Sequence, residues 1–202
     1  MLKRLAVATA AITALAGLAA CGADDDKTGS GTSSAQPGAA FNGADVTFAT
    51  SMIPHHQQAL EMVDLTEGRT LDPAVRTLAD QIKAAQAPEI DTMSGWLTDW
   101  GKPVPAATGT GDDSHDMGGM DMGSGDMPGM MSADEMAGLE NASDAAFEAM
   151  WLRMMIRHHQ GAVTMARTEL ADGRYDAATK LAQAVIDGQQ AEIDQMSRLL
   201  RP

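Results

Sequence analysis

Cysteine, aromatic and basic residues are all scarce in this sequence. With one cysteine in 202 residues the chain cannot form an internal disulfide or an all-thiolate metal site. Aromatic residues make up only 3%, so a core must be built mainly from Ala, Leu, Ile, Val and Met. The 14 Lys and Arg face 28 Asp and Glu, a net charge of −14 that opposes binding to nucleic acid, and we expect no nucleic-acid partner. Such a surface also attracts cations, although solubility alone accounts for it.

The N-terminus carries two basic residues and then an apolar run that ends at Ala20. This run is short and closes with small residues, so it indicates a secretory signal over residues 1–20 rather than a membrane-spanning helix. The sequence Leu-Ala-Ala-Cys resembles the lipobox of bacterial lipoproteins, in which the cysteine, here Cys21, is acylated. The alternative is an ordinary cleavage site beside an incidental cysteine. Residues 21–40 are typical of a flexible tether that holds a domain off the membrane.

A repeated motif dominates the remaining sequence. The stretch Met52–Ala59 recurs as Met155–Ala162, displaced by 103 residues, and the two copies hold four of the five histidines. The displacement stays constant in the segment that follows each copy, where several apolar and polar residues correspond. The polar ones include Gln86 and Glu89 in the first half, and Gln189 and Glu192 in the second. The repeated unit is therefore a pair of segments.

Hydrophobic periodicity predicts that each pair of segments is a helical hairpin. We expect hairpin 1 at about 44–100, hairpin 2 at about 132–200, and a long Met/Gly/Asp-rich loop without regular structure at 102–131. The predicted fold is all-α, a four-helix bundle over residues 41–202.

Local signals refine the helix bounds. The expected helices span about 45–67, 73–100, 144–171 and 176–200, and a capping-box pattern at 132–135 indicates a further short helix. Pro54 lies inside the first of them, so that helix either begins near Ser51 or bends there.

Within this frame, the histidines fall on apolar helix faces. His55 and His56 flank the apolar stripe of their helix, and His158 and His159 do the same in the second copy. Glu89 lies in the middle of a stripe that includes Ala85 and Met93, and Glu192 has the equivalent place. A carboxylate in an apolar seam is costly unless it is paired, and the available partners are the imidazoles.

These side chains form a candidate metal site in each hairpin. Two histidines, one glutamate and two methionines per hairpin are expected around a common interior region: His55, His56, Glu89, Met52 and Met62, and then His158, His159, Glu192, Met155 and Met165. Thioether sulfur selects Cu(I) and, by the same softness, Ag(I), whereas imidazole also accepts iron and zinc. The alternative is that the methionines fill the core and the histidines only hydrogen-bond the glutamates.

The loop points to the same soft metals. Seven of 16 methionines lie between positions 117 and 136, among Gly and Asp rather than on an apolar face. We expect no core against which this segment packs, so metal binding explains the enrichment better than a polar linker that gained methionines by chance. The candidate loop ligands are His115, Met117, Met120, Met122, Met127, Met130 and Met131.

The doubled motif Met-Ile-Pro-His-His-Gln-Gln-Ala resembles that of the DUF305 family, and the resemblance extends over about residues 41–200. It implies an exported, ferritin-like four-helix bundle, in some members linked to periplasmic copper binding and resistance. The motif residues that it carries over are Met52, His55, His56, Met155, His158 and His159. In the second copy Arg157 replaces the usual proline. A fixed cation beside His158 would make the second site weaker or purely structural.

Three functions follow. The first, which we favour, is a lipid-anchored, extracytoplasmic protein that sequesters Cu(I) or Ag(I) or hands it to a copper-handling protein partner. The second is a structural or interaction bundle with buried His–Glu networks and no metal. The third is an enzyme, a di-metal oxidase, but that chemistry uses Glu-x-x-His motifs, which the sequence lacks. We therefore expect no enzyme. Haem is a remote option because Cys-x-x-Cys-His is also missing.

Overall fold

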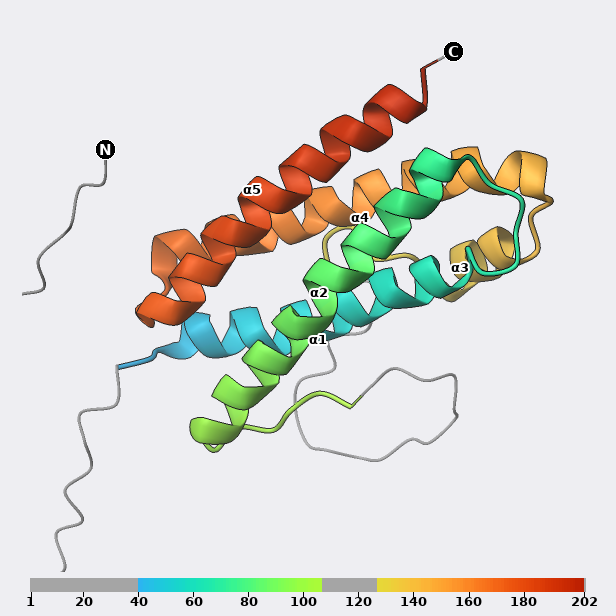
Figure 1. Cartoon of the computed structure of the whole chain (residues 1–202). Helices are drawn as coiled ribbons and strands as arrows, with labels where there is room; N and C mark the ends of the chain where they lie inside the picture. Colours follow the sequence, from blue (N-terminus) through green and yellow to red (C-terminus); the bar gives the residue numbers. More distant parts are fainter. Residues whose placement is uncertain (1–39, 107–126, 202) are drawn as a thin grey trace, which may run out of the picture. The chain divides into compact units, whose positions relative to one another are not determined.

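The computed structural model describes residues 40–106 and 127–201, and the described residues form five helices (Figure 1). In chain order these are α1 (Gly43–Asp64), α2 (Pro73–Asp99), α3 (Ala133–Glu140), α4 (Asp144–Asp172) and α5 (Asp176–Leu199). The all-α prediction is confirmed. None of the helices in the described part is long and apolar enough to cross a membrane.

Helix α1 begins at a capping box and continues through its internal proline. The Asn42 side chain accepts hydrogen bonds from the first-turn backbone, while the Asp45 carboxylate accepts one from the Asn42 N–H at 2.6 Å. Pro54 lies in the middle of the helix, where it removes one backbone donor without ending the helix. The alternative of a start near Ser51 is therefore wrong.

The other helix ends follow the sequence signals closely. Asp72 caps α2 with Pro73 in its first turn, as the sequence predicts. Ser132 and Glu135 form the expected capping box of α3, which ends at Asn141. Helices α4 and α5 end within one residue of their predicted ends.

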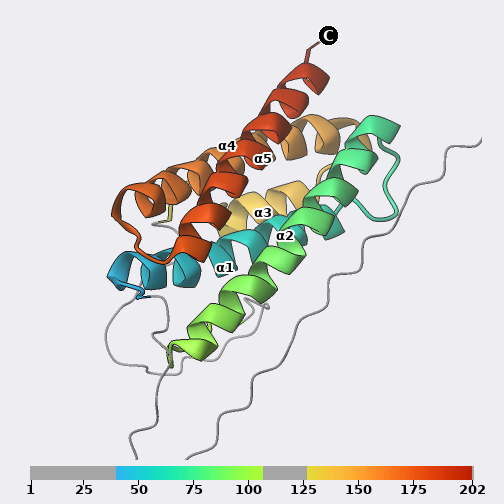
Figure 2. The ribbon, with the colours of Figure 1, turned by 60° about the vertical axis from the view of Figure 1, so that its left-hand side comes forward.

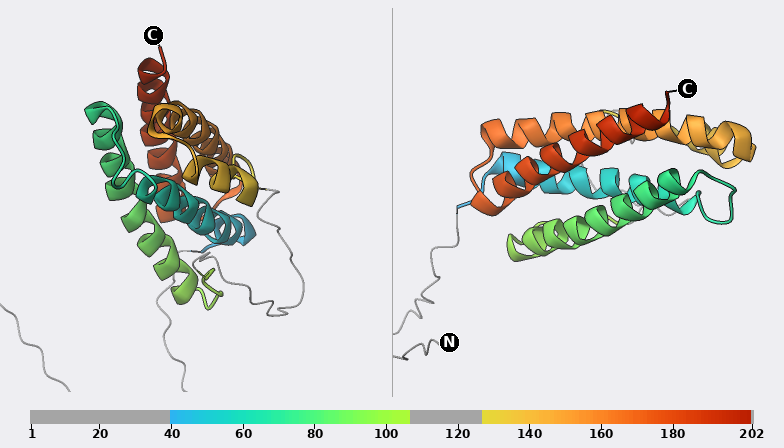
Figure 3. Two further views of the ribbon diagram at one scale, coloured as in Figure 1. Left: turned by 90° about the vertical axis from the view of Figure 1, so that its right-hand side faces the viewer. Right: turned by 45° about the horizontal axis from the view of Figure 1, so that its top comes forward.

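The helices form two antiparallel hairpins, α1–α2 and α4–α5, which pack together mainly through α1 and α4 (Figures 2 and 3). Helices α1 and α4 are antiparallel. The end of α1 meets the start of α4, where the Trp151 indole N–H donates to the Met62 carbonyl at 2.8 Å. At the opposite end, Asp45 accepts hydrogen bonds from the backbone of Arg174 and Tyr175 in the α4–α5 turn.

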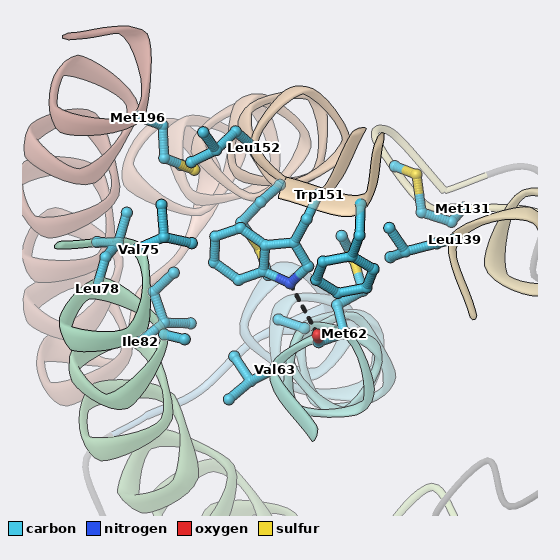
Figure 4. Close-up of a cluster of buried hydrophobic side chains, with 14 of the residues drawn as sticks. Met62, Val63, Val75, Leu78, Ile82, Met131, Leu139, Trp151, Leu152 and Met196 are labelled. Atoms are coloured by element: carbon cyan, nitrogen blue, oxygen red, sulfur yellow. Dashed lines mark hydrogen bonds between the residues drawn. The ribbon is translucent and has the colours of Figure 1, made fainter. Parts of the chain in front are cut away.

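The core consists of two apolar clusters, one toward each end of α1. The first surrounds Trp151 and Phe147 and includes Met62 and Met155 (Figure 4). The second includes Met52, Met93 and a set of small residues from α4 and α5. Along both α1 and α4, the histidine pair lies between the residues of one cluster and those of the other. The histidines therefore interrupt a core that is otherwise apolar.

The buried face of α2 is rotated from the predicted stripe. Ala85 is exposed, whereas Gln86 is buried, so the expectation that Ala85 belongs to the apolar seam is wrong. Gln189, which corresponds to Gln86 in the second half, is buried in the same way. Gln86 and Gln189 line the same small cavity between α2 and α5, and an apolar periodicity cannot detect such polar surroundings.

Residues 127–131, which we call the strap, cross α4 at the level of the histidines. Gly129 has a φ of +81°, and a Cβ on Gly161 would lie only 1.8 Å from the Pro128 carbonyl oxygen, so both glycines are needed for this crossing. Met131 at the end of the strap is buried in the first apolar cluster. The expectation that the Met-rich segment packs against no core is therefore wrong for this residue.

Candidate metal centre

All four motif histidines lie in one layer of the bundle and are 0% exposed. Within each pair, the two histidines contact different helices. The first histidine of each pair, His55 or His158, lies at the α1–α4 contact, and the second, His56 or His159, reaches the other helix of its own hairpin. The prediction that both imidazoles of each pair face the interior is confirmed.

His55 and His158 stack on each other across the two hairpins. Their ring centroids are 3.8 Å apart with an interplanar angle of 37°. Burial, and then the neighbouring imidazole of His56, lowers the pKa of His55 to about 3. Burial and the nearby His55 hold the pKa of His158 well below its usual value. Both rings are therefore neutral at physiological pH, the state in which imidazole binds metals.

His56 and His159 make equivalent bonds in the two halves. His56 Nε2 lies 2.7 Å from Glu89 Oε2, and His159 Nε2 lies 2.7 Å from Glu192 Oε2. This confirms that the imidazoles are the partners of the two carboxylates. Because a carboxylate accepts, the proton is on Nε2, which leaves Nδ1 of a neutral ring with a free lone pair. The arrangement matches the carboxylate–histidine pairs that orient metal ligands.

Several buried imidazole nitrogens have no hydrogen-bond partner within the described part of the chain. They are Nδ1 of His55, His56 and His159, and both ring nitrogens of His158. Leaving a buried polar atom unpaired costs free energy, and such groups in a native protein call for an explanation. Because several such nitrogens lie in one layer, they indicate a binding site for an electron-pair acceptor such as a metal ion.

The strap closes one side of this layer. His55 Nε2 donates to the Pro128 carbonyl at 3.1 Å. Gln58, one turn further along α1, bonds Met131 twice, accepting from its N–H at 2.7 Å and donating to its carbonyl at 2.8 Å. The strap is thus attached to α1 by hydrogen bonds and to α4 by close contact. Met127 and Met130 are half-buried in the same segment.

The helix methionines do not gather as the sequence predicts. Met52 and Met62 belong to different clusters, on opposite sides of the histidine layer, because ten residues of helix separate them. The expectation that they share one region is therefore wrong. Instead, Met52 lies in the cluster against which Met165 of the other hairpin packs, and Met62 lies with Met155. Each cluster combines methionines from both copies.

Arg157 is not directed at His158. Its guanidinium group is about half exposed and bonds Glu135 at 2.6 Å, with the Met131 sulfur as a further contact. The charge at this position is therefore partly neutralised at the α3–α4 surface. The expected weakening of the second site by an adjacent cation has no support from this geometry.

Four predicted ligands, His115, Met117, Met120 and Met122, lie outside the described residues, and so does Cys21, the predicted lipidation site. Within the described ranges, no three His, Cys, Asp or Glu side chains are arranged to hold a metal ion together. The donors brought together are imidazoles, with thioethers in the adjoining clusters.

Sequence reasoning also missed a pair of buried carboxyl groups, Asp45 and Glu169, beside the start of α1. Burial, and then the adjacent Asp45, raises the pKa of Glu169 to about 8. Burial alone would raise the pKa of Asp45, but backbone N–H groups of Tyr175, Asn42 and Arg174 lower it. Glu169 also lines a cavity of about 330 Å³ beside the start of α1. Its position among apolar residues of α4 was the available signal.

Comparisons with known proteins agree with this architecture. A structure of a DUF305 fragment from Deinococcus radiodurans is 31% identical, with 79% of this chain and 96% of that chain covered and a TM-score of 0.66. A secreted DUF305 protein from Streptomyces coelicolor is 36% identical, with 78% and 91% covered and a TM-score of 0.66. CopM in its Cu(I)-bound form is 30% identical, with 77% and 94% covered and a TM-score of 0.60.

CopM has also been solved with Cu(II) and with silver. A search of curated proteins finds no match. The model of the family described as "Domain of unknown function (DUF305)" matches residues 45–200, which is most of the chain and includes both copies of the histidine motif. This chain belongs to the DUF305 family.

Proposed function

We propose that this protein binds Cu(I), or Ag(I) in its place, at the histidine layer, and that it sequesters the ion or hands it to a copper-handling protein partner. The observation that carries the proposal is the set of buried imidazole nitrogens without partners on His55, His56, His158 and His159. A bound cation would satisfy several of these lone pairs at once, which the apolar neighbours cannot do.

The donor chemistry favours a soft monovalent ion. Imidazole also suits zinc and iron, but the layer is bordered by buried thioethers, and sulfur ligands select Cu(I). Cu(I) and Ag(I) form low-coordinate complexes, so a cluster of three ionisable ligands is not required. In this proposal Met52 and Met155, each one turn before a histidine pair, are the nearest thioether donors in sequence.

Glu89 and Glu192 then orient the ligands. Each carboxylate accepts the Nε2 proton of its histidine, which fixes the orientation of the ring and leaves Nδ1 as the nitrogen that can coordinate the ion. We assign the two glutamates this supporting part rather than direct coordination of the soft ion, since carboxylate oxygen is a hard donor.

The Met-rich segment would capture the ion before it reaches the bundle. Its methionines Met117, Met120, Met122, Met127, Met130 and Met131 lead into the strap, which ends against the histidine layer. Thioethers need no deprotonation and suit an oxidising exterior. In this proposal the chain is exported and anchored through Cys21, which places it in that compartment. The copper-bound and silver-bound forms of CopM support the choice of metal.

A purely structural bundle makes a different prediction. The two His–Glu bonds would stabilise such a bundle without any metal. It gives no account, however, of the unpartnered nitrogens of His158, which contacts neither carboxylate. The two functions therefore differ in what they predict for His55 and His158.

A competition titration with the Cu(I) chelator bicinchoninate tests the proposal. We expect the purified protein to remove Cu(I) from the chelator, and the double variant His55→Ala, His158→Ala to lose most of this capacity at the bundle. Gln160→Ala with Gln190→Ala is the matched control, because both side chains are exposed and neither is a candidate ligand of the soft ion. Deletion of residues 107–126 measures the contribution of the loop separately.

Failure to take up Cu(I) by both the wild-type chain and the loop deletion would sink the proposal. Uptake that disappears only with the loop would move the site out of the bundle. Circular dichroism of each variant shows whether the helices are retained, so that loss of binding is not confused with loss of the fold.

A further inference from the structure

A second polar region lies between α2 and α5, beyond the two His–Glu bonds. It surrounds a cavity of about 40 Å³. The lining residues that bear polar side chains are Gln86 and Glu89 from α2, and Gln189 and Glu192 from α5. Since both pairs are related by the same displacement as the histidine motif, the two halves of the chain contribute the same donors.

The two glutamine side chains have no partner within the described residues. Gln86 is 2% exposed and Gln189 is 4% exposed, and neither the nitrogen nor the oxygen of either amide is hydrogen-bonded. An unpaired buried amide is unfavourable, and here it occurs twice at one cavity. The cavity therefore calls for a polar occupant.

The two glutamates add charge to this cavity. Each directs Oε2 to its histidine, which leaves Oε1 for another partner, and the side chains are 20% and 18% exposed. The site is therefore accessible from solvent and combines two carboxylate oxygens with two amide oxygens. A set made only of oxygen donors suits hard divalent cations such as Ca²⁺, Mg²⁺ and Mn²⁺.

The size of the cavity agrees with a small hydrated ion. One water-sized body needs roughly 10–15 Å³ of such volume, so this cavity has room for about three. An ion with one or two waters fills it, and the waters bond the amide N–H groups. An organic ligand of ordinary size does not fit.

We propose that the groove between α2 and α5 binds one hard divalent cation through Gln86, Glu89, Gln189 and Glu192. This site goes beyond the soft-ion function of the histidine layer. The glutamates form the boundary between the two sites, with imidazole on one side and amide oxygen on the other. The bound cation holds α2 against α5, which otherwise share little contact.

A manganese titration followed by electron paramagnetic resonance tests this site. We expect the wild-type protein to reduce the free Mn²⁺ signal with a stoichiometry of about one, and added Ca²⁺ to restore it. Gln86→Leu with Gln189→Leu should weaken the affinity by at least roughly tenfold, because two of four protein donors are lost. The matched control is Gln183→Leu with Gln190→Leu, two exposed glutamines of α5, which should bind Mn²⁺ like the wild type.

A conservative variant keeps the test independent of folding. Gln86→Glu retains an oxygen donor and should bind Mn²⁺ at least as tightly as the wild type. Absence of saturable Mn²⁺ binding by the wild type, or unchanged binding by the double leucine variant, overturns the proposal and leaves water as the occupant. Bicinchoninate competition on the same leucine variant should give wild-type Cu(I) uptake, so failure of this site is distinguishable from failure of the histidine site.

Discussion

Gly161 stands where the first copy of the repeat has Gln58, and the two residues contact the strap in different ways. Gln58 bonds Met131 through its side-chain amide. Gly161 lets the Pro128 carbonyl approach the α4 backbone, a place that a side chain would occupy. The two positions thus hold the strap in different ways, Gln58 by hydrogen bonds and Gly161 by leaving room for the strap backbone.

Replacing Gly161 by alanine should displace the strap. Its Cβ would lie 1.8 Å from the Pro128 oxygen, so we expect a loss of about 1–3 kcal/mol in the free energy of unfolding, measured by urea denaturation. Gly95→Ala in α2 is the control, because nothing lies within 4 Å of its added Cβ. That control should gain stability from helix propensity, by roughly 1 kcal/mol at most. If the two variants were equally stable, the close approach of the strap to α4 at Gly161 would be contradicted.

At the scale of elements, Asp45 connects the start of α1 to the turn between α4 and α5. Its Oδ1 accepts from the N–H groups of Arg174 and Tyr175, and its Oδ2 accepts from Asn42. The Glu169 carboxyl group lies at this junction and, because its pKa is about 8, it stays protonated and neutral below that pH. One negative charge is thus tolerated at this junction, and a second is disfavoured.

This pair predicts a pH dependence of stability. Between its usual pKa of 4.5 and about 8, Glu169 holds a proton in the folded chain that the unfolded chain has released. The contribution of Glu169 to the free energy of unfolding should therefore fall as pH rises across this window, which the difference between the wild type and a Glu169 variant isolates. Urea denaturation from pH 5 to 8.5 should show a steeper fall for the wild type than for Glu169→Gln, with exposed Glu140→Gln behaving like the wild type. Parallel profiles for all three proteins would refute the assignment.

The sequence predicts the elements better than their contacts. Periodicity and capping signals locate the helices, because these depend on residues close in the chain. The His56–Glu89 and His159–Glu192 bonds are also predictable, since a repeat that conserves both members of a pair within the chain indicates their proximity.

The remaining features depend on distances across the bundle. Gln86 is buried where α2 lies beside α5, and the periodicity of a single helix does not encode which residues meet a second helix. Met131 looks like a loop residue by composition, yet it is buried because Gln58 and Gly161 hold its segment against two helices. Long-range contacts of this kind leave no periodic signal.

At the scale of the whole molecule, a bound ion in the histidine layer would link both hairpins. Ag(I) at a free concentration about a hundredfold above its Kd should stabilise the fold by about 2.7 kcal/mol, a rise of roughly 5–10 °C in Tm. Thermal unfolding followed by circular dichroism measures this shift. His55→Ala with His158→Ala should show little of it, whereas Gln160→Ala with Gln190→Ala, at two exposed positions, should keep it. A shift that survives the double variant in full would place the stabilising ion elsewhere.

The strap makes the surroundings of His55 and His158 unequal for any ligand that reaches the histidine layer. Two symmetric half-sites would fill in either order and be indistinguishable by spectroscopy. Here His55 Nε2 donates to the Pro128 carbonyl, while the two ring nitrogens of His158 have no hydrogen-bond partner among the described residues. A ligand that binds His55 Nε2 must therefore displace the Pro128 carbonyl, whereas the ring nitrogens of His158 require no such displacement. We therefore expect the two copies of the repeat to differ in how readily their first histidine reaches a ligand.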